Sequence, residues 1–157
     1  PKSSPTALLD GELYQVQISF WAATGYPQWV EIIYPFEKTV SGYSMTCKFP
    51  AAMPERWTVE GSDDGSNWTT IDTQDDGRVP MGETYPLKGS RVPKGWRLAT
   101  LYENRIYPLL SEADAKGERI FIQRNVPLEK PVEFRHYRFV FIGGKSGELL
   151  INEISLY

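Results

Sequence analysis

Alternating hydrophobic and polar residues on both sides of a polar turn predict a β-hairpin over residues 54–71. Trp57 and Val59 share one face of its first strand, and the polar residues between and after them face the other way. Residues 61–67 are Gly, Ser, Asp and Asn, which tolerate positive φ or hydrogen-bond their own backbone, so they form the turn. The strand pattern then resumes at Trp68.

Strand patterns bounded by turn residues dominate the rest of the chain. The 13 glycines and 12 prolines are scattered between them, and no stretch has a sustained helical period. Residues 108–115 are the one segment with helical spacing, and they predict two helical turns at most. The pattern therefore predicts an all-β chain built from short antiparallel strands, as in a sandwich.

Several segments carry motifs in a fixed order. The hairpin contains Glu-Gly-Ser-x-Asp-Gly-x-x-Trp at residues 60–68. Before it, residues 26–36 hold Pro-Gln-Trp and a hydrophobic strand, and residues 38–45 hold Val-x-Gly-Tyr. After it come the arginine-tyrosine strand 135–141 and the ending 148–157 with its Glu-Ile pair. In this order the segments resemble the discoidin, or F5/8 type C, family.

The resemblance implies a fold and a class of function. The fold is an antiparallel jelly-roll β-sandwich of the galactose-binding-like type, with residues 1–157 forming one domain whose first and last strands lie close together. Because the family includes many carbohydrate-binding modules, the implied function is non-catalytic binding of cell-surface or polysaccharide glycans. The parent would be a larger secreted enzyme or a phage or other viral receptor-binding protein, so the location would be extracellular or virion-associated.

Residues 75–117 depart from the family. They separate the Trp68 strand from the next strand pattern at residues 119–122, whereas a typical relative has a far shorter connection there. We therefore expect a long loop insertion within the single domain. Loops of this length without much secondary structure are usually functional.

Composition and charge narrow the function classes. A chain of 157 residues with 41% hydrophobic residues can bury a substantial core, and a net charge of -3 offers no basic field for nucleic acid. No apolar run is long enough to span a membrane, and the first residues do not have the charged-then-apolar pattern of a leader, so we expect any export signal to have been removed or the domain to belong to a longer polypeptide. Cys47 has no partner for a disulfide, which favours a bacterial or viral source.

Potential catalytic groups have simpler explanations. His136 is the single histidine and lies in a strand pattern, and Cys47 is an isolated thiol at the end of another strand. The carboxylate pairs at residues 63–64 and 75–76 each adjoin a glycine, which is typical of turns. We therefore expect the protein not to be an enzyme.

The resemblance also implies a structural Ca²⁺. Relatives often hold the ion between an early Asp-Gly loop and a glutamate near the last strand, and Asp10 and Glu153 match those places. Ca²⁺ requires six to eight oxygens, so backbone carbonyls and Glu12 would have to contribute. Because the residues that follow Asp10 depart from the family pattern, the alternative is that Asp10 caps a turn and Glu153 faces solvent or an arginine.

A sugar site needs an aromatic ring for the C–H face of the sugar and polar groups for its hydroxyls. In sugar-binding relatives a histidine and an aromatic residue follow the early tryptophan, and an arginine follows the Gly-Tyr strand. Here the histidine position is alanine, whereas Tyr26 and Lys48 occupy the other two. The insertion adds Trp96 and Arg97, so the predicted ligand-binding residues are Tyr26, Lys48, Trp96 and Arg97, binding weakly at Kd ~0.1–1 mM. The alternative for these aromatic side chains is packing over one end of the sandwich.

Three other tryptophans, Trp29, Trp57 and Trp68, lie in alternating strands, and we expect them to pack in the core.

Two further function classes stay open. The chain could be a protein–protein assembly or adhesion module of a virion or surface complex, with the insertion as the contact. It could also bind lipid through an apolar loop tip, for which Trp96, between Lys94 and Arg97, is the single candidate. A glycan module predicts an exposed aromatic ring beside polar groups, whereas an assembly module predicts a broad apolar patch and oligomers.

Overall fold

The computed structural model describes residues 21–49, 52–76, 95–102, 105–109, 120–144 and 146–157. These residues form nine strands and contain no α-helix. No helix in this part of the chain is long and apolar enough to cross a membrane. The strands are β1 (Trp21–Thr24), β2 (Gln28–Cys47), β3 (Pro54–Ser62), β4 (Thr69–Asp75), β5 (Trp96–Tyr102), β6 (Arg105–Pro108), β7 (Ile120–Gly144), β8 (Glu148–Ile151) and β9 (Glu153–Leu156).

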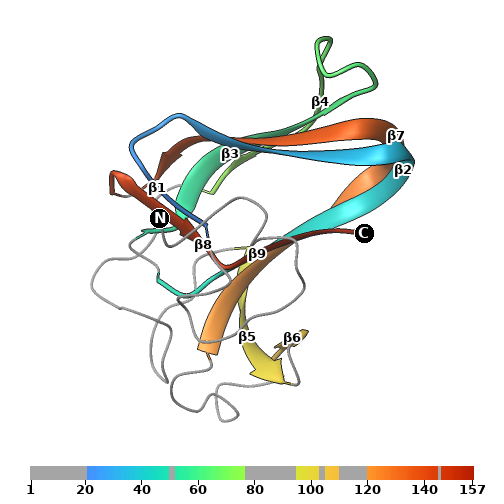
Figure 1. Ribbon diagram of the computed structural model, residues 1–157. Coiled ribbons are helices and arrows are strands. Elements are labelled where there is room, and N and C mark those ends of the chain that lie inside the picture. The colour runs from blue at the N-terminus through green and yellow to red at the C-terminus, as the bar shows by residue number, and fades with distance from the viewer. Residues whose placement is uncertain (1–20, 50–51, 77–94, 103–104, 110–119, 145) are drawn as a thin grey trace.

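Two long strands, β2 and β7, build both layers of the fold. Both bend over at one end of the molecule, so that each contributes one half to an upper layer and one half to a lower layer (Figure 1). The upper layer is ordered β4-β3-β7-β2, and in the lower layer the other halves of β7 and β2 pair with β5 and β9. All pairings are antiparallel, and β1 and β8 form a separate two-stranded sheet. The predicted antiparallel β-sandwich is confirmed.

The bend coincides with breaks in the pairing of β2 with β7. The register shifts between Ile33 and Lys38, and again between Val40 and Gly42. Pro35, which cannot donate a ladder hydrogen bond, lies in the first break. Strands that pass from one sheet of a sandwich to the other do so through such bulges and bends.

Aromatic side chains fill the space between the layers. Trp57 on β3 is fully buried and meets Trp96 on β5 edge to face, with ring centroids 6.2 Å apart. The Trp57 indole donates to the Tyr43 hydroxyl at 2.8 Å, and that hydroxyl donates to the Asp72 carboxylate at 2.8 Å. A buried N–H or O–H without a partner would cost free energy, so this chain of hydrogen bonds lets polar aromatics serve as core residues.

The segment predicted to be a loop insertion contributes strands to the sandwich. β5 and β6 both lie within residues 75–117, and β5 pairs with the first residues of β7, Ile120 to Arg124. Pro108 ends β6 and does not begin a helix; residues 110–115 of the predicted helix lie outside the described residues. The expectation of a loop throughout is thus wrong for residues 96–102 and 105–108, because β5 pairs with β7 beyond the segment and β6 pairs with β5.

Two of the three tryptophans expected in the core lie elsewhere. Trp29 is 61% exposed, because its neighbours Val30 and Ile32 are the inward residues of β2. Trp68 is half-buried on the outer surface of the upper layer, where the Arg138 guanidinium lies 4.0 Å from its ring centre. Only Trp57 occupies the predicted core position.

The predicted hairpin is confirmed, with β3 and β4 joined by a turn at the tip of the upper layer (Figure 1). Asp64 organises this turn. Its carboxylate accepts hydrogen bonds from the backbone N–H groups of Ser66 and Asn67, both at 2.8 Å, and from the Asn67 amide at 2.6 Å. These bonds to the ionised form lower the pKa of Asp64 well below its usual range. The carboxylate therefore has the turn-forming role that the sequence indicated.

Substitution Trp57→Ala should destabilise the fold by about 3–5 kcal/mol, because it opens a cavity between the layers and removes the hydrogen bond that the Tyr43 hydroxyl accepts. Trp29→Ala should change the free energy of unfolding by only about 0.5 kcal/mol, because that side chain is exposed. Urea unfolding of both variants measures the difference. Equal losses would contradict the assignment of the two indoles to core and surface.

Asp64→Asn should reduce the dependence of stability on acid. A carboxyl whose pKa is depressed on folding stabilises the protein above its unfolded pKa of about 3.9, and that stabilisation is lost as the pH falls below it. The drop in melting temperature between pH 7 and pH 3 should therefore be smaller in Asp64→Asn than in wild type. Asp63→Asn, at the exposed neighbouring position, is the control and should keep the full drop.

Candidate functional site

The four residues predicted to bind ligand do not share one surface. Trp96 and Arg97 are consecutive on β5, so their side chains point to opposite faces of the lower layer. Trp96 points inward, is 6% exposed, and donates its indole N–H to Asp76 at 2.8 Å. The prediction of an exposed Trp96 ring is wrong, because this indole is part of the core that closes around Trp57.

Asp76, which accepts the Trp96 indole hydrogen bond, is itself held by an arginine. The Arg124 guanidinium pairs with its carboxylate at 3.0 Å and also donates to Gln74 at 3.0 Å. The side chains of Arg124 and Asp76 are 17% and 6% exposed, so the pair is largely shielded from water. This ion pair joins β7 to the end of β4 and holds the acceptor for the Trp96 indole.

Arg97 and Lys48 lie on the outer face of the lower layer. Arg97 is exposed, and its Nε and Nη2 both donate to the Gln123 side-chain oxygen, at 3.0 and 2.8 Å. Gln123 in turn donates to the Thr46 hydroxyl at 3.3 Å. Lys48 is only 9% exposed, with its ammonium 5.8 Å from the centre of the Phe121 ring. The strands thus bring together two cations, an amide and a ring from separate parts of the chain.

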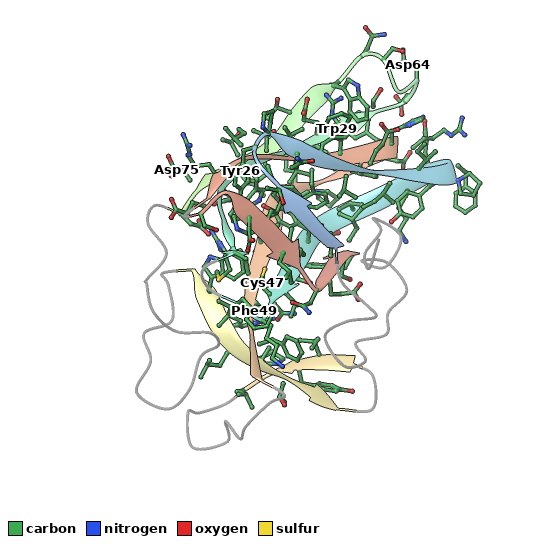
Figure 2. The ribbon with its side chains drawn as sticks, turned by 60° about the vertical axis from the view of Figure 1, so that its left-hand side comes forward. Tyr26, Trp29, Cys47, Phe49, Asp64 and Asp75 are labelled. Carbon is green, nitrogen blue, oxygen red and sulfur yellow. The ribbon has the colours of Figure 1, made fainter. Side chains whose placement is uncertain are left out.

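Tyr26 lies apart from Arg97 and Lys48 and is half-buried against the core. Figure 2 shows Tyr26 near the upper layer, with Cys47 and Phe49 lower in the molecule. The Tyr26 hydroxyl is buried. A Cβ added to Gly144 would collide with it, so the ring can occupy this position only because residue 144 is a glycine. Burial raises the pKa of Tyr26 to about 12, so the hydroxyl is neutral and able to donate at physiological pH.

His136 and Cys47 make contacts that belong to the packing of the fold. The His136 Nδ1 lies 3.1 Å from the Glu31 carboxylate, and its ring meets Trp68 edge to face at 6.3 Å between centroids. The Cys47 thiol is fully buried, and burial raises its pKa, which disfavours the nucleophilic thiolate.

For the predicted Ca²⁺ site the structure describes one of the two ligands. Glu153 lies half-buried on β9 opposite Thr46, with its Oε2 atom buried. A carboxylate in this position has the chemistry of a Ca²⁺ ligand. Asp10 lies outside the described residues, and among those that are described no three His, Cys, Asp or Glu side chains gather as a metal site.

Trp29, labelled in Figure 2, is an exposed aromatic ring that the sequence analysis placed in the core. Glu31 was the signal that could have placed it. Residues two apart on a strand share a face, and an unpaired glutamate is almost never buried, so Trp29 had to share the outer face with Glu31.

A groove of about 330 Å³ lies between β4 and the bend of β7, and none of the predicted ligand-binding residues reaches it. Its lining mixes aliphatic and charged side chains without an aromatic ring: Ile71, Asp72, Pro127, Leu128, Glu129, Lys130 and Val132.

Comparison with known proteins identifies structures that have a similar fold. No family model matches the chain, and no curated protein matches its sequence. Solved structures do match. A family 32 carbohydrate-binding module of Streptococcus pneumoniae EndoD superposes with a TM-score of 0.61 at 10% identity, covering 100% of this chain and 86% of that one. A Clostridium perfringens module of the same family, in complex with GalNAc-β-1,3-galactose, gives 0.59 at 10% identity, covering 100% and 88%.

A chitosan-binding module from Paenibacillus sp. IK-5, in complex with chitotriose, also superposes, with a TM-score of 0.59 at 14% identity, covering 99% of this chain and 87% of that one. The three matches each span 99–100% of this chain. The chain therefore has the discoidin-like β-sandwich fold of the family 32 carbohydrate-binding modules.

Proposed function

We propose that this protein is a non-catalytic carbohydrate-binding module that recognises glycans outside the cell, as part of a larger secreted enzyme or a phage or other viral receptor-binding protein. The observation that carries the proposal is the fold. Modules that bind sugars superpose on 97–100% of this chain, among them one described as pectin-binding and others crystallised with galactose or chitotriose.

The outer face of the lower layer supplies suitable chemistry. Gln123 holds the exposed Arg97 guanidinium in a fixed orientation, which lowers the entropy lost when a sugar hydroxyl binds to it. Lys48 adds a second cation beside the Phe121 ring. Tyr26 lies apart from this face and its hydroxyl is buried, so we do not include it among the ligand contacts. With few contacts and the loss of sugar hydration, affinity should be weak, at Kd ~0.1–1 mM, or ~-4 to -5.5 kcal/mol.

The test is a glycan array followed by titration of the best ligand. Arg97→Ala should weaken binding about tenfold, since it removes a charged donor worth roughly 1.4 kcal/mol. Arg135→Ala is the matched control, because Arg135 is an exposed arginine on the half of β7 that does not pair with β5. An array that stays blank with multivalent protein would refute carbohydrate binding. Equal loss in both variants would show that general charge is responsible and not this face.

We also propose that Glu153 and Asp10 bind a structural Ca²⁺. A ligand that binds only the folded state stabilises it by RT ln(1 + [L]/Kd), about 2.7 kcal/mol at 100 times Kd. Chelation with EDTA should therefore lower the melting temperature of wild type but not of Glu153→Gln. Glu148→Gln, at an exposed position on β8, should respond like wild type. Identical melts of the wild type with and without EDTA would refute the site.

A further inference from the structure

The outer face of the upper layer carries a row of side chains that crosses four strands. Trp29 on β2 lies opposite Val140 on β7, Val140 opposite Thr58 on β3, and Thr58 opposite Thr73 on β4. With about 4.8 Å between neighbouring strands, this row is roughly 14 Å long, which suits a short stretch of a sugar chain. It begins at an indole that is 61% exposed and continues over an aliphatic side chain to two hydroxyls.

A second, charged row lies directly beside the first. Here Glu31 on β2 lies opposite Arg138 on β7, which lies opposite Glu60 on β3. Arg138 donates to both Glu60 oxygens, at 3.2 and 3.3 Å, and its guanidinium lies 4.0 Å from the centre of the Trp68 ring. The His136 Nδ1 atom lies 3.1 Å from the Glu31 carboxylate. Contacts on several sides fix these polar groups before any ligand arrives.

We propose that this face, with Trp29 as its stacking ring, is a binding surface for an uncharged polysaccharide chain, separate from the Arg97 face. The inference rests on the proposed carbohydrate-binding function and names the substrate class of a second site. The C–H face of a pyranose packs on the Trp29 indole, and hydroxyls of the same chain reach the Thr58 and Thr73 hydroxyls and the Glu31 carboxylate.

The charges on the face favour this occupant over others. Glu31 stands two residues from Trp29 on the same strand face, so it repels the carboxylate of an acidic sugar. Arg138 and Glu60 neutralise one another, so the row offers no field for a strongly charged ligand. The cores of protein interfaces are depleted of charged residues. On this face the charged row lies between the exposed Ile33 and the row of Trp29, which disfavours a protein partner as the occupant.

Affinity gel electrophoresis tests the proposal with the whole chain. The uncharged probes are galactan, galactomannan and hydroxyethylcellulose, and the acidic probe is polygalacturonate. At least one uncharged probe should retard the wild type, and Trp29→Ala should weaken that binding at least tenfold. Trp29→Phe, which keeps a ring, should stay within a few fold of wild type. Tyr107→Ala removes another exposed ring, on β6, and should have no effect.

The outcomes separate this inference from the proposed function. If an uncharged polysaccharide binds Trp29→Ala as well as wild type while Arg97→Ala loses binding, the second site is refuted and the proposed function stands. If neither the array nor any gel shows binding by wild type, both are refuted. Retardation by polygalacturonate alone would overturn the stated chemistry. A wild-type dimer that Trp29→Ala converts to monomer, without any effect on polysaccharide binding, would show that a second copy of the chain is the occupant.

Discussion

The contact of the Trp57 indole with both layers is the interaction on which the rest of the structure depends. Its ring packs against Trp96 of the lower layer, and its N–H donates to Tyr43, which lies on the lower half of β2. Tyr43 then donates to Asp72 on β4, back in the upper layer. These buried polar atoms are satisfied only when β2, β3 and β4 are all in place, and the ring contact with Trp96 adds β5. The network thus ties the hairpin to the segment that joins it to β7.

The bend of β2 and β7 has a second consequence, because it gives the molecule two outer faces of different character. On the lower layer, Thr46 and Gln123 are buried and support an exposed arginine. On the upper layer, the ion pair of Arg138 and Glu60 lies beside an exposed indole and aliphatic side chains. Both faces hold polar groups in fixed positions, which is the property that weak, multivalent glycan binding requires.

Cys47 and His136, which could in principle be reactive, both contribute to packing. Cys47 fills core space between the layers, where burial disfavours its thiolate. His136 connects Glu31 to Trp68 and so helps to set the geometry of the upper face. Orientation of neighbouring groups by such contacts is typical of binding surfaces that stay rigid when ligand arrives.

The sequence by itself determined the local features of this protein. The β3–β4 hairpin, the Asp64 turn and the alternation that buries Trp57 all depend on residues close together in the chain, so their patterns predict them directly. Alternation specifies which residues share a face, but it does not state which face meets the core. For that reason Trp29 was assigned inward although Glu31 shares its face, and Trp96 was assigned to a loop surface although it packs on Trp57. For Trp29 the neighbouring Glu31 already indicated the outer face. Only the tertiary structure decided the position of Trp96, because it follows from the long-range pairing of β5 with the first half of β7.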